Sequence, residues 1–161
     1  MIRAVLFDRD GTLIADDPSH TRDVELMPYA REAFDLLRSR GMRVGVVTNQ
    51  PAAHDDDLAR VHGEIESRLG TFDGWFICRH APAARCECRK PQPGLVLEAA
   101  RTFGMEPREC AVIGDIGSDV EAAQRAGAQA VLVPTGKTLH PESASAPAVS
   151  ANLLAAVERL I

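Results

Sequence analysis

Five short apolar runs, each separated from the next by a polar or helical stretch, constrain the fold of this chain more than any other feature. Each run has the length and composition of a buried strand. Strands that alternate with helices are typical of βα units on a parallel sheet, joined by right-handed crossovers. We therefore predict a doubly wound, Rossmann-like α/β fold. Its five predicted strands are 2–7, 43–48, 74–78, 110–114 and 128–133.

Helical periodicity fills most of the chain between these strands. Apolar residues recur at the spacing of one helix face in five segments. The segment 134–150 is instead rich in Pro, Ser and Ala, and we expect a loop there. The predicted helices are 29–40, 55–69, 95–103, 118–126 and 152–161.

Length and charge limit what this chain can be. With 161 residues, of which 45% are apolar and 25% charged, it is expected to form one globular domain over 1–161. Lys and Arg total 18 against 23 Asp and Glu, a net charge of −5 without a basic run, so we expect no nucleic-acid partner. The sequence contains neither an apolar stretch of about 18 residues nor a signal peptide. We therefore expect no membrane association and a cytoplasmic protein.

Polar residues follow the predicted strands where each strand ends. Asp8, Arg9 and Asp10 follow the first strand, Thr48 closes the second, and Asp115 follows the fourth. Because ligands of doubly wound sheets bind at the carboxyl ends of the strands, we expect these side chains to form one site.

The Asp8-x-Asp10-Gly11 segment predicts a cation site. Residues two apart in an extended stretch point to the same side, and two carboxylates so placed repel each other unless a cation lies between them. Mg²⁺ suits such oxygen ligands, Gly11 allows a tight turn, and Asp115 offers a further carboxylate. The alternative is a pair of solvated acids on a turn.

Phosphate is the ligand that the neighbouring polar groups favour. The hydroxyl of Thr48 and the ammonium of Lys90 are both suited to phosphate oxygens. The sequence has no nucleotide-binding glycine motif, which argues against a nucleotide cofactor.

Four potential zinc ligands lie within eleven residues. Cys78, His80, Cys86 and Cys88 are spaced so that both ends of a loop over 78–90 can close on one tetrahedral Zn²⁺. Four protein ligands leave no open position, so this zinc would be structural. A disulfide is the alternative, which a reducing cytoplasm and the poor geometry of a Cys-x-Cys bridge disfavour. Free thiols are the remaining interpretation.

Four segments, found in order along the chain, resemble the motifs of the haloacid dehalogenase superfamily of phosphatases. They are FDRDGTL at 7–13, VVTNQ at 46–50, RKPQPG at 89–94 and IGDIGSD at 113–119. The resemblance implies a Mg²⁺-dependent phosphomonoesterase that acts through an aspartyl-phosphate.

The resemblance also implies roles for individual residues. Asp8 would be the nucleophile and Asp10 the general acid and base, while Thr48 and Lys90 would hold phosphate oxygens. Asp8, the backbone carbonyl of Asp10 and Asp115 would hold Mg²⁺. Asp119 would either cap and orient its helix or act as a further ligand. The substrate contacts expected from the same motifs are Arg9, Gly11, Thr12, Asn49 and Arg89.

The zinc-loop pattern narrows the resemblance to one subgroup. This subgroup contains D-glycero-D-manno-heptose-1,7-bisphosphate 7-phosphatases and histidinol-phosphate phosphatases, and its members lack a large cap domain. We expect a capless monomer that acts on a small phosphorylated metabolite, and we favour the heptose bisphosphate, losing its 7-phosphate. The alternatives are histidinol phosphate and a catalytically silent, zinc-stabilised binding module.

Two departures from the heptose-type pattern concern the second phosphate of such a substrate. The segment 51–57 lacks the glycine and arginine of that pattern, and Ile116 stands where many members have lysine. The histidines outside the zinc loop show no paired partner, and we expect them at the surface, with His54 nearest the site. They are His20, His54, His62 and His140.

Overall fold

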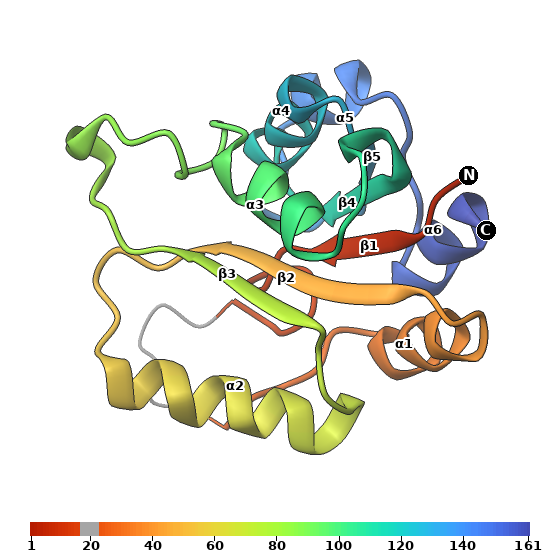
Figure 1. Cartoon of the computed structure of the whole chain (residues 1–161), viewed down its shortest axis with the longest axis horizontal. Helices are drawn as coiled ribbons and strands as arrows, with labels where there is room; N and C mark the ends of the chain where they lie inside the picture. The colour runs from red at the N-terminus through yellow and green to blue at the C-terminus, as the bar shows by residue number, and fades with distance from the viewer. Residues whose placement is uncertain (17–22) are drawn as a thin grey trace.

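The computed structural model describes residues 1–16 and 23–161, and its centre is a single parallel sheet. The sheet has the five strands that the alternating pattern predicted, and they run in the order β3-β2-β1-β4-β5 (Figure 1). All neighbouring strands pair in parallel. The strands are β1 (Ala4–Phe7), β2 (Arg43–Asn49), β3 (Gly74–Cys78), β4 (Cys110–Gly114) and β5 (Gln129–Leu132).

Helices cover both faces of the sheet, which gives the three predicted layers (Figure 1). On one face, α1 (Ala30–Ser39), α2 (Asp55–Leu69) and α6 (Leu153–Leu160) pack in one apolar cluster with β1 and β2. On the other face, α3 (Gly94–Thr102) and α4 (Gly117–Ala126) form the second cluster. Burial of both sheet faces explains why the strands are continuous apolar runs without polar alternation.

The strand register brings the carboxyl ends of the central strands level. Phe7 at the end of β1 lies opposite Val46 in β2 and Ile113 in β4. The amide of Asp8 continues the ladder, donating to the carbonyl of Ile113 at 2.9 Å. The chain leaves β1 toward β2 on one side and returns to β4 on the other, so this edge is the switch point where such sheets bind ligands.

One expectation about local structure was wrong, and the other element boundaries need only small adjustments. The segment 134–150, expected to be a loop, contains α5 (His140–Ser145). The carboxylate of Glu142 accepts from the amide of Leu139 at 2.8 Å and caps this short helix. The helix has no apolar face, so the sequence shows no helical periodicity there. Elsewhere the predicted elements differ from the observed ones by at most two residues at either end.

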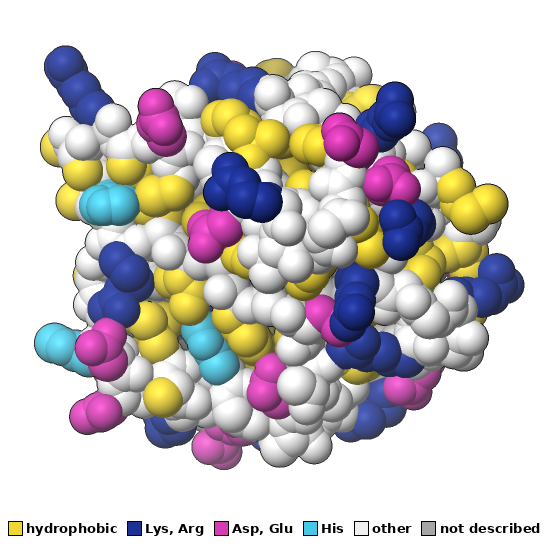
Figure 2. Space-filling view, in the orientation of Figure 1, with side chains coloured by type: hydrophobic (Ala, Val, Ile, Leu, Met, Phe, Trp, Pro, Cys, Tyr) yellow, Lys and Arg dark blue, Asp and Glu magenta, His cyan; other side chains and the backbone are white. Residues whose placement is uncertain are grey.

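The surface mixes charges of both signs. On the face shown in Figure 2, Lys and Arg side chains are interspersed with Asp and Glu. In the described part of the chain, no helix is long and apolar enough to cross a membrane.

Candidate active site

A pocket of about 290 Å³ opens at the carboxyl ends of the strands. Five separate loops contribute residues to it, those after β1, β2, β4 and β5 and the end of the zinc loop. Predicted site residues that line this pocket are Asp8, Asp10, Thr48, Asn49, Arg89, Lys90 and Asp115. Asp119, for which the motifs left two roles open, lines the pocket as well, and the structure adds Asp16, Ile116, Ser118 and Lys137.

A buried ammonium organises the base of the pocket. The Nζ of Lys90 donates to Asp8 Oδ1 and to Asp119 Oδ1, both at 2.7 Å, and to the carbonyl of Val47 at 2.9 Å. All three charged residues are at most 8% exposed. Burial acts to lower the pKa of Lys90, but the carboxylates of Asp119 and Asp8 outweigh it and raise that pKa above its usual value. Lys90 therefore stays charged and fixes one oxygen of the predicted nucleophile.

Three buried carboxylates meet at this point and match the donor set of a divalent cation. Oxygens of Asp8, Asp115 and Asp119 lie within 4.8 Å of one another. With only Lys90 to balance them, the group has an excess of two negative charges when ionised. Burial, together with the charge of Asp119, raises the pKa of Asp8 well above its usual value and that of Asp115 to about 6. One Mg²⁺ ion would offset this excess and suits carboxylate oxygens, so the residues fit the ion.

Asp119 contacts both Lys90 and the backbone at the start of α4. Its Oδ1 accepts from Lys90, while its Oδ2 accepts from the amides of Asp115 and Ile116 at 3.2 and 3.3 Å. The side chain thus caps the start of α4 and orients the lysine. Both oxygens are already engaged, which favours a positioning role.

Glycine is required where the carboxylates come closest to the backbone. Gly11 has φ +83°, and a Cβ there would lie 2.4 Å from Oδ2 of Asp115. A Cβ on Gly114 would lie 2.3 Å from the side chain of Asp119. The turn after β1 and the end of β4 therefore approach each other only because both positions lack a side chain.

The carboxylate of Asp10 is held apart from the other three. Gln50 donates from Nε2 to Asp10 Oδ2 at 2.6 Å and to Thr48 Oγ1 at 2.9 Å. From the other side, Arg9 donates from Nε and Nη2 to Asp10 Oδ1, both at 3.1 Å. Asp10 is thereby fixed at the pocket, and its carboxylate does not belong to the group of three that could hold a metal ion.

Three residues expected to contact substrate do not line the pocket. The guanidinium of Arg9 turns toward Asp10 and His62, because the short link between the two aspartates directs successive side chains to opposite sides. The amide of Gly11 donates to the carbonyl of Ile14 at 2.8 Å, so this amide already has a partner. Thr12 is buried and donates to Asp8 Oδ2 at 3.4 Å, so it contacts the nucleophile.

Asn49 joins the end of β2 to the end of the zinc loop. Its Nδ2 donates to the carbonyl of Lys90 at 3.2 Å, and its Oδ1 accepts from the amide of Lys90 at 3.1 Å. This pair of bonds fixes the backbone of the lysine, which explains how a loop residue reaches the base of the pocket.

Two cationic groups stand nearer the rim. Arg89 is half-buried, and its Nη1 is enclosed without a hydrogen-bond partner among the described residues. An enclosed guanidinium nitrogen of this kind calls for an acceptor such as a phosphate oxygen. Lys137, from the loop after β5, is exposed and pairs with Asp16 across the pocket mouth. The chain has only two lysines, Lys90 and Lys137, and both line this pocket.

The four zinc-loop residues converge as their spacing predicted. The Sγ atoms of Cys78 and Cys88 lie 3.2 Å apart and those of Cys78 and Cys86 3.7 Å apart. The Nδ1 of His80 lies 3.1 Å from Cys88 Sγ and 3.5 Å from Cys78 Sγ. Ligands of a tetrahedral zinc are separated by about 3.3–3.8 Å, given bonds of about 2.0–2.3 Å. The S–S distances are far longer than a disulfide bond of about 2.05 Å, so the cluster fits a closed metal site.

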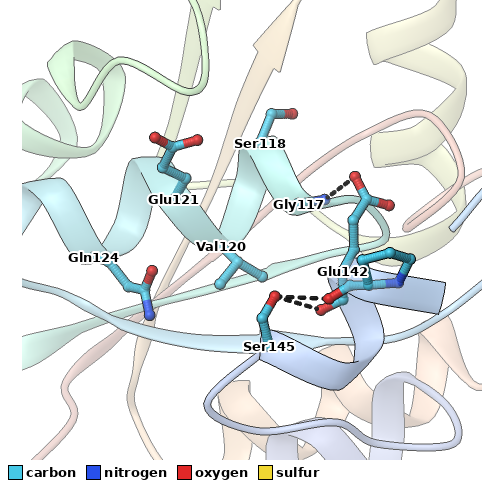
Figure 3. Close-up of a pocket in the computed structure, with 8 residues that line it drawn as sticks. Gly117, Ser118, Val120, Glu121, Gln124, Glu142 and Ser145 are labelled. Atoms are coloured by element: carbon cyan, nitrogen blue, oxygen red, sulfur yellow. Dashed lines mark hydrogen bonds between the residues drawn. The ribbon is translucent and has the colours of Figure 1, made fainter. Parts of the chain in front are cut away.

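The segment after β5 supports the Asp115 loop. Thr135 Oγ1 donates to Asp115 Oδ2 at 3.3 Å, and Thr138 Oγ1 donates to the carbonyl of Asp115. Figure 3 shows Glu142 of α5 accepting from the amide of Gly117, at 3.0 Å, beside an open groove between α4 and α5. That groove contains none of the predicted site residues.

The remaining histidines differ in exposure, and His62 is half-buried. His54 and His140 are exposed as expected, and His20 lies outside the described residues. The prediction for His62 was wrong, because its ring stacks on Trp75 with centroids 3.8 Å apart. Sequence spacing missed this contact since the two residues come from α2 and β3.

Comparison with known proteins matches the two halves of the chain to the same superfamily. The family described as "Haloacid dehalogenase-like hydrolase" matches residues 5–70, and the HAD-hydrolase-like family matches residues 87–157. These ranges contain the loops after β1, β2 and β4 that build the pocket.

Curated relatives of similar length point to one subgroup. A D-glycero-beta-D-manno-heptose-1,7-bisphosphate 7-phosphatase of Pseudomonas putida is 31% identical over 84% of this chain and 85% of its own length. A D-glycero-alpha-D-manno-heptose-1,7-bisphosphate 7-phosphatase of Mycobacterium bovis is 34% identical over 78% and 74%, respectively. Relatives named for both anomers thus have comparable similarity.

A solved structure resembles the whole chain. The D,D-heptose 1,7-bisphosphate phosphatase of B. bronchiseptica, crystallised with magnesium and phosphate, superimposes with a TM-score of 0.85 at 25% identity. The match covers 99% of this chain and 98% of that structure, so no additional cap domain distinguishes the two.

Proposed function

Because the chain belongs to the haloacid dehalogenase superfamily of phosphatases, in the subgroup of the heptose-1,7-bisphosphate 7-phosphatases, we propose that it removes the 7-phosphate of D-glycero-D-manno-heptose 1,7-bisphosphate. The observation that carries this proposal is the buried Asp8, fixed by Lys90 at the base of a pocket whose rim presents Asp10. We propose that the whole chain works as one domain and as a monomer.

The first chemical step transfers the phosphoryl group to Asp8. A carboxylate oxygen of Asp8 bonds to phosphorus as the bond from phosphorus to the sugar oxygen breaks. The leaving oxygen takes the electron pair of that bond and a proton from the carboxyl of Asp10. Gln50 and Arg9 hold Asp10 in place for this transfer.

The second step returns the enzyme to its starting state. Asp10, now a carboxylate, takes a proton from water as the water oxygen attacks phosphorus. The bond from phosphorus to Asp8 breaks and inorganic phosphate leaves. Splitting the hydrolysis into two displacements lets one acid–base group serve both steps.

Charge neutralisation allows a carboxylate to approach a phosphate dianion. The Lys90 ammonium and the Thr48 hydroxyl, which both line the pocket, would hold phosphate oxygens. Mg²⁺, held by Asp8, Asp115 and the carbonyl of Asp10, would supply the remaining positive charge. Asp119 keeps Lys90 in position.

We propose that zinc holds the end of this arrangement in place. Cys78, His80, Cys86 and Cys88 would bind it, and the chain continues from Cys88 directly into Arg89 and Lys90. Zinc bound by these residues would fix the conformation of the loop that carries the phosphate-binding lysine.

To bind the second phosphate of the substrate, the protein needs a cationic side chain other than Lys90, which is paired at the base of the pocket. Arg89 has an enclosed nitrogen without an acceptor, and Lys137 is bound only through an exposed ion pair to Asp16. Solvent screens an exposed pair of this kind, so a phosphate can displace Asp16 at little cost. Together these two groups can replace the basic residues that are missing from 51–57 and at Ile116.

A substrate panel tests this proposal. Phosphate release with Mg²⁺ is measured for heptose 1,7-bisphosphate in both anomers, heptose 7-phosphate, histidinol phosphate and an aryl phosphate. We expect the highest kcat/KM for one anomer of the bisphosphate. Lys137→Met should raise KM for the bisphosphate more than for heptose 7-phosphate, with Arg85→Met, outside the pocket, as the control. Preference for histidinol phosphate would contradict the substrate assignment, and no release from any ester would favour a binding module.

A further inference from the structure

A chain of four side chains connects the predicted general acid to the edge of the sheet. Arg9 follows β1, His62 lies on α2 and Trp75 lies on β3. The guanidinium of Arg9 contacts Asp10 on one side and His62 on the other. The His62 ring in turn stacks on Trp75 with an interplanar angle of 17°. Neither Arg9, His62 nor Trp75 lines the pocket in which the substrate would bind.

We propose that Arg9, oriented by His62 and Trp75, is a positioning residue for Asp10 that favours proton transfer to the leaving group. The inference rests on the proposed function and concerns its first chemical step. Arg9 itself does not touch substrate in this arrangement.

Among the residues that the structure describes, Asp10 is the charged partner of the buried Arg9. The residue is 2% exposed, and its Nε lies 3.1 and 3.2 Å from the two oxygens of Asp10, with Nη2 at 3.1 Å from Oδ1. With Gln50 on Oδ2 at 2.6 Å, the plane of the carboxyl group is fixed from both sides. When Asp10 gives its proton to the leaving oxygen, the guanidinium stabilises the carboxylate that forms.

His62 is suited to hold the other end of the guanidinium. Arginine only donates hydrogen bonds, so the His62 Nε2 at 3.3 Å from Nη1 must accept and the ring proton must lie on Nδ1. Burial, and the positive charge of Arg9, lower the pKa of His62 to about 4. The ring is therefore neutral near pH 7 and can accept, while Trp75 prevents it from turning away.

Stability alone does not account for a buried arginine here. Replacing both partners of a buried ion pair by well-packed apolar residues is often neutral or stabilising, so the Arg9–Asp10 pair is weak evidence for a purely structural role. An effect of the guanidinium charge on the chemistry of the Asp10 carboxyl group explains this pair better.

The dependence of the rate on the leaving group tests this inference. kcat/KM is measured for a series of phosphate monoesters from alkyl to dinitrophenyl phosphate, because alkoxides need a proton as they leave and dinitrophenolate does not. We expect Arg9→Met to lower kcat/KM about 100-fold for alkyl phosphate and less than about fivefold for dinitrophenyl phosphate. Arg43→Met, which removes an ion pair to Asp73 at the opposite end of β2, is the matched control and should change neither.

His62→Phe provides a second, less disruptive variant. It keeps an aromatic ring against Trp75 but removes the acceptor for Arg9, so we expect about a fivefold loss with the same dependence on leaving group. An equal loss across the ester series, or no loss in either variant, would overturn the positioning role. If the wild-type protein released phosphate from none of the esters, the proposed function would fail instead, so the two failures are distinguishable.

Discussion

Replacement of Asp119 by alanine should destabilise the protein and release Lys90. Asp119 is 1% exposed and accepts three hydrogen bonds, one from the ammonium and two from backbone amides. Removing one partner from a buried ion pair costs about 3–5 kcal/mol, and each lost amide acceptor adds about 1 kcal/mol. Relief of the repulsion that Asp119 exerts on Asp8 and Asp115 offsets part of this loss, so we expect a net cost of about 3–4 kcal/mol.

Urea unfolding with EDTA present measures this cost without a contribution from bound Mg²⁺. With a slope of about 1–3 kcal/mol per molar, the midpoint should fall by roughly 1–4 M. Asp119→Asn keeps one acceptor oxygen and should lie between the alanine variant and the wild type. Asp35→Ala, on the exposed face of α1, is the control and should shift the free energy by no more than about 0.5 kcal/mol. A change below about 1 kcal/mol for Asp119→Ala would refute the reasoning about the buried network.

Three further perturbations test separate parts of the account. Cys86→Ser should lower the zinc content well below one ion per chain and reduce Tm by at least about 5 °C. It should also raise KM, because the loop that carries Lys90 loosens. Unchanged metal content and an unchanged Tm would exclude the zinc site. Gly11→Ala should lower the free energy of unfolding by about 1–3 kcal/mol and weaken Mg²⁺ binding measured by calorimetry, because the new Cβ would meet the carboxylate of Asp115. An unaltered Mg²⁺ affinity would argue against that contact. Because the pKa of His62 is lowered from 6.5 to about 4, the unfolded chain binds a proton before the folded one does, so stability should fall as pH falls through this window. His62→Phe should lose less stability than wild type between pH 7 and 5 in urea titrations, and an identical loss would contradict the assignment.

The parallel sheet and the location of the site could be predicted because both depend on backbone patterns. Buried parallel strands are short apolar runs, and the polar residues that follow them gather at one edge whatever their side chains do. The zinc cluster could also be predicted from the sequence, because its four residues belong to one loop and their spacing alone limits the geometry. These residues are Cys78, His80, Cys86 and Cys88.

Contacts made by long side chains could not be predicted in this way. Arg9 was expected to face substrate, yet its direction depends on whether a neighbour offers an acceptor, and that acceptor is on α2. Gln50 was visible within the VVTNQ segment but its contact with Asp10 requires knowing how closely β1 and β2 align. The short helix α5 escaped notice because one capped turn without an apolar face produces no periodic signal.

Trapping the phosphoenzyme tests the central claim most directly. The protein is mixed with heptose 1,7-bisphosphate and Mg²⁺, quenched with acid within one turnover and digested for mass spectrometry. We expect a single phosphoryl group on the peptide that contains Asp8, and its loss in Asp8→Asn together with phosphate release. Phosphate release by the Asp8→Asn protein, or a phosphoryl group on any other residue, would contradict the account.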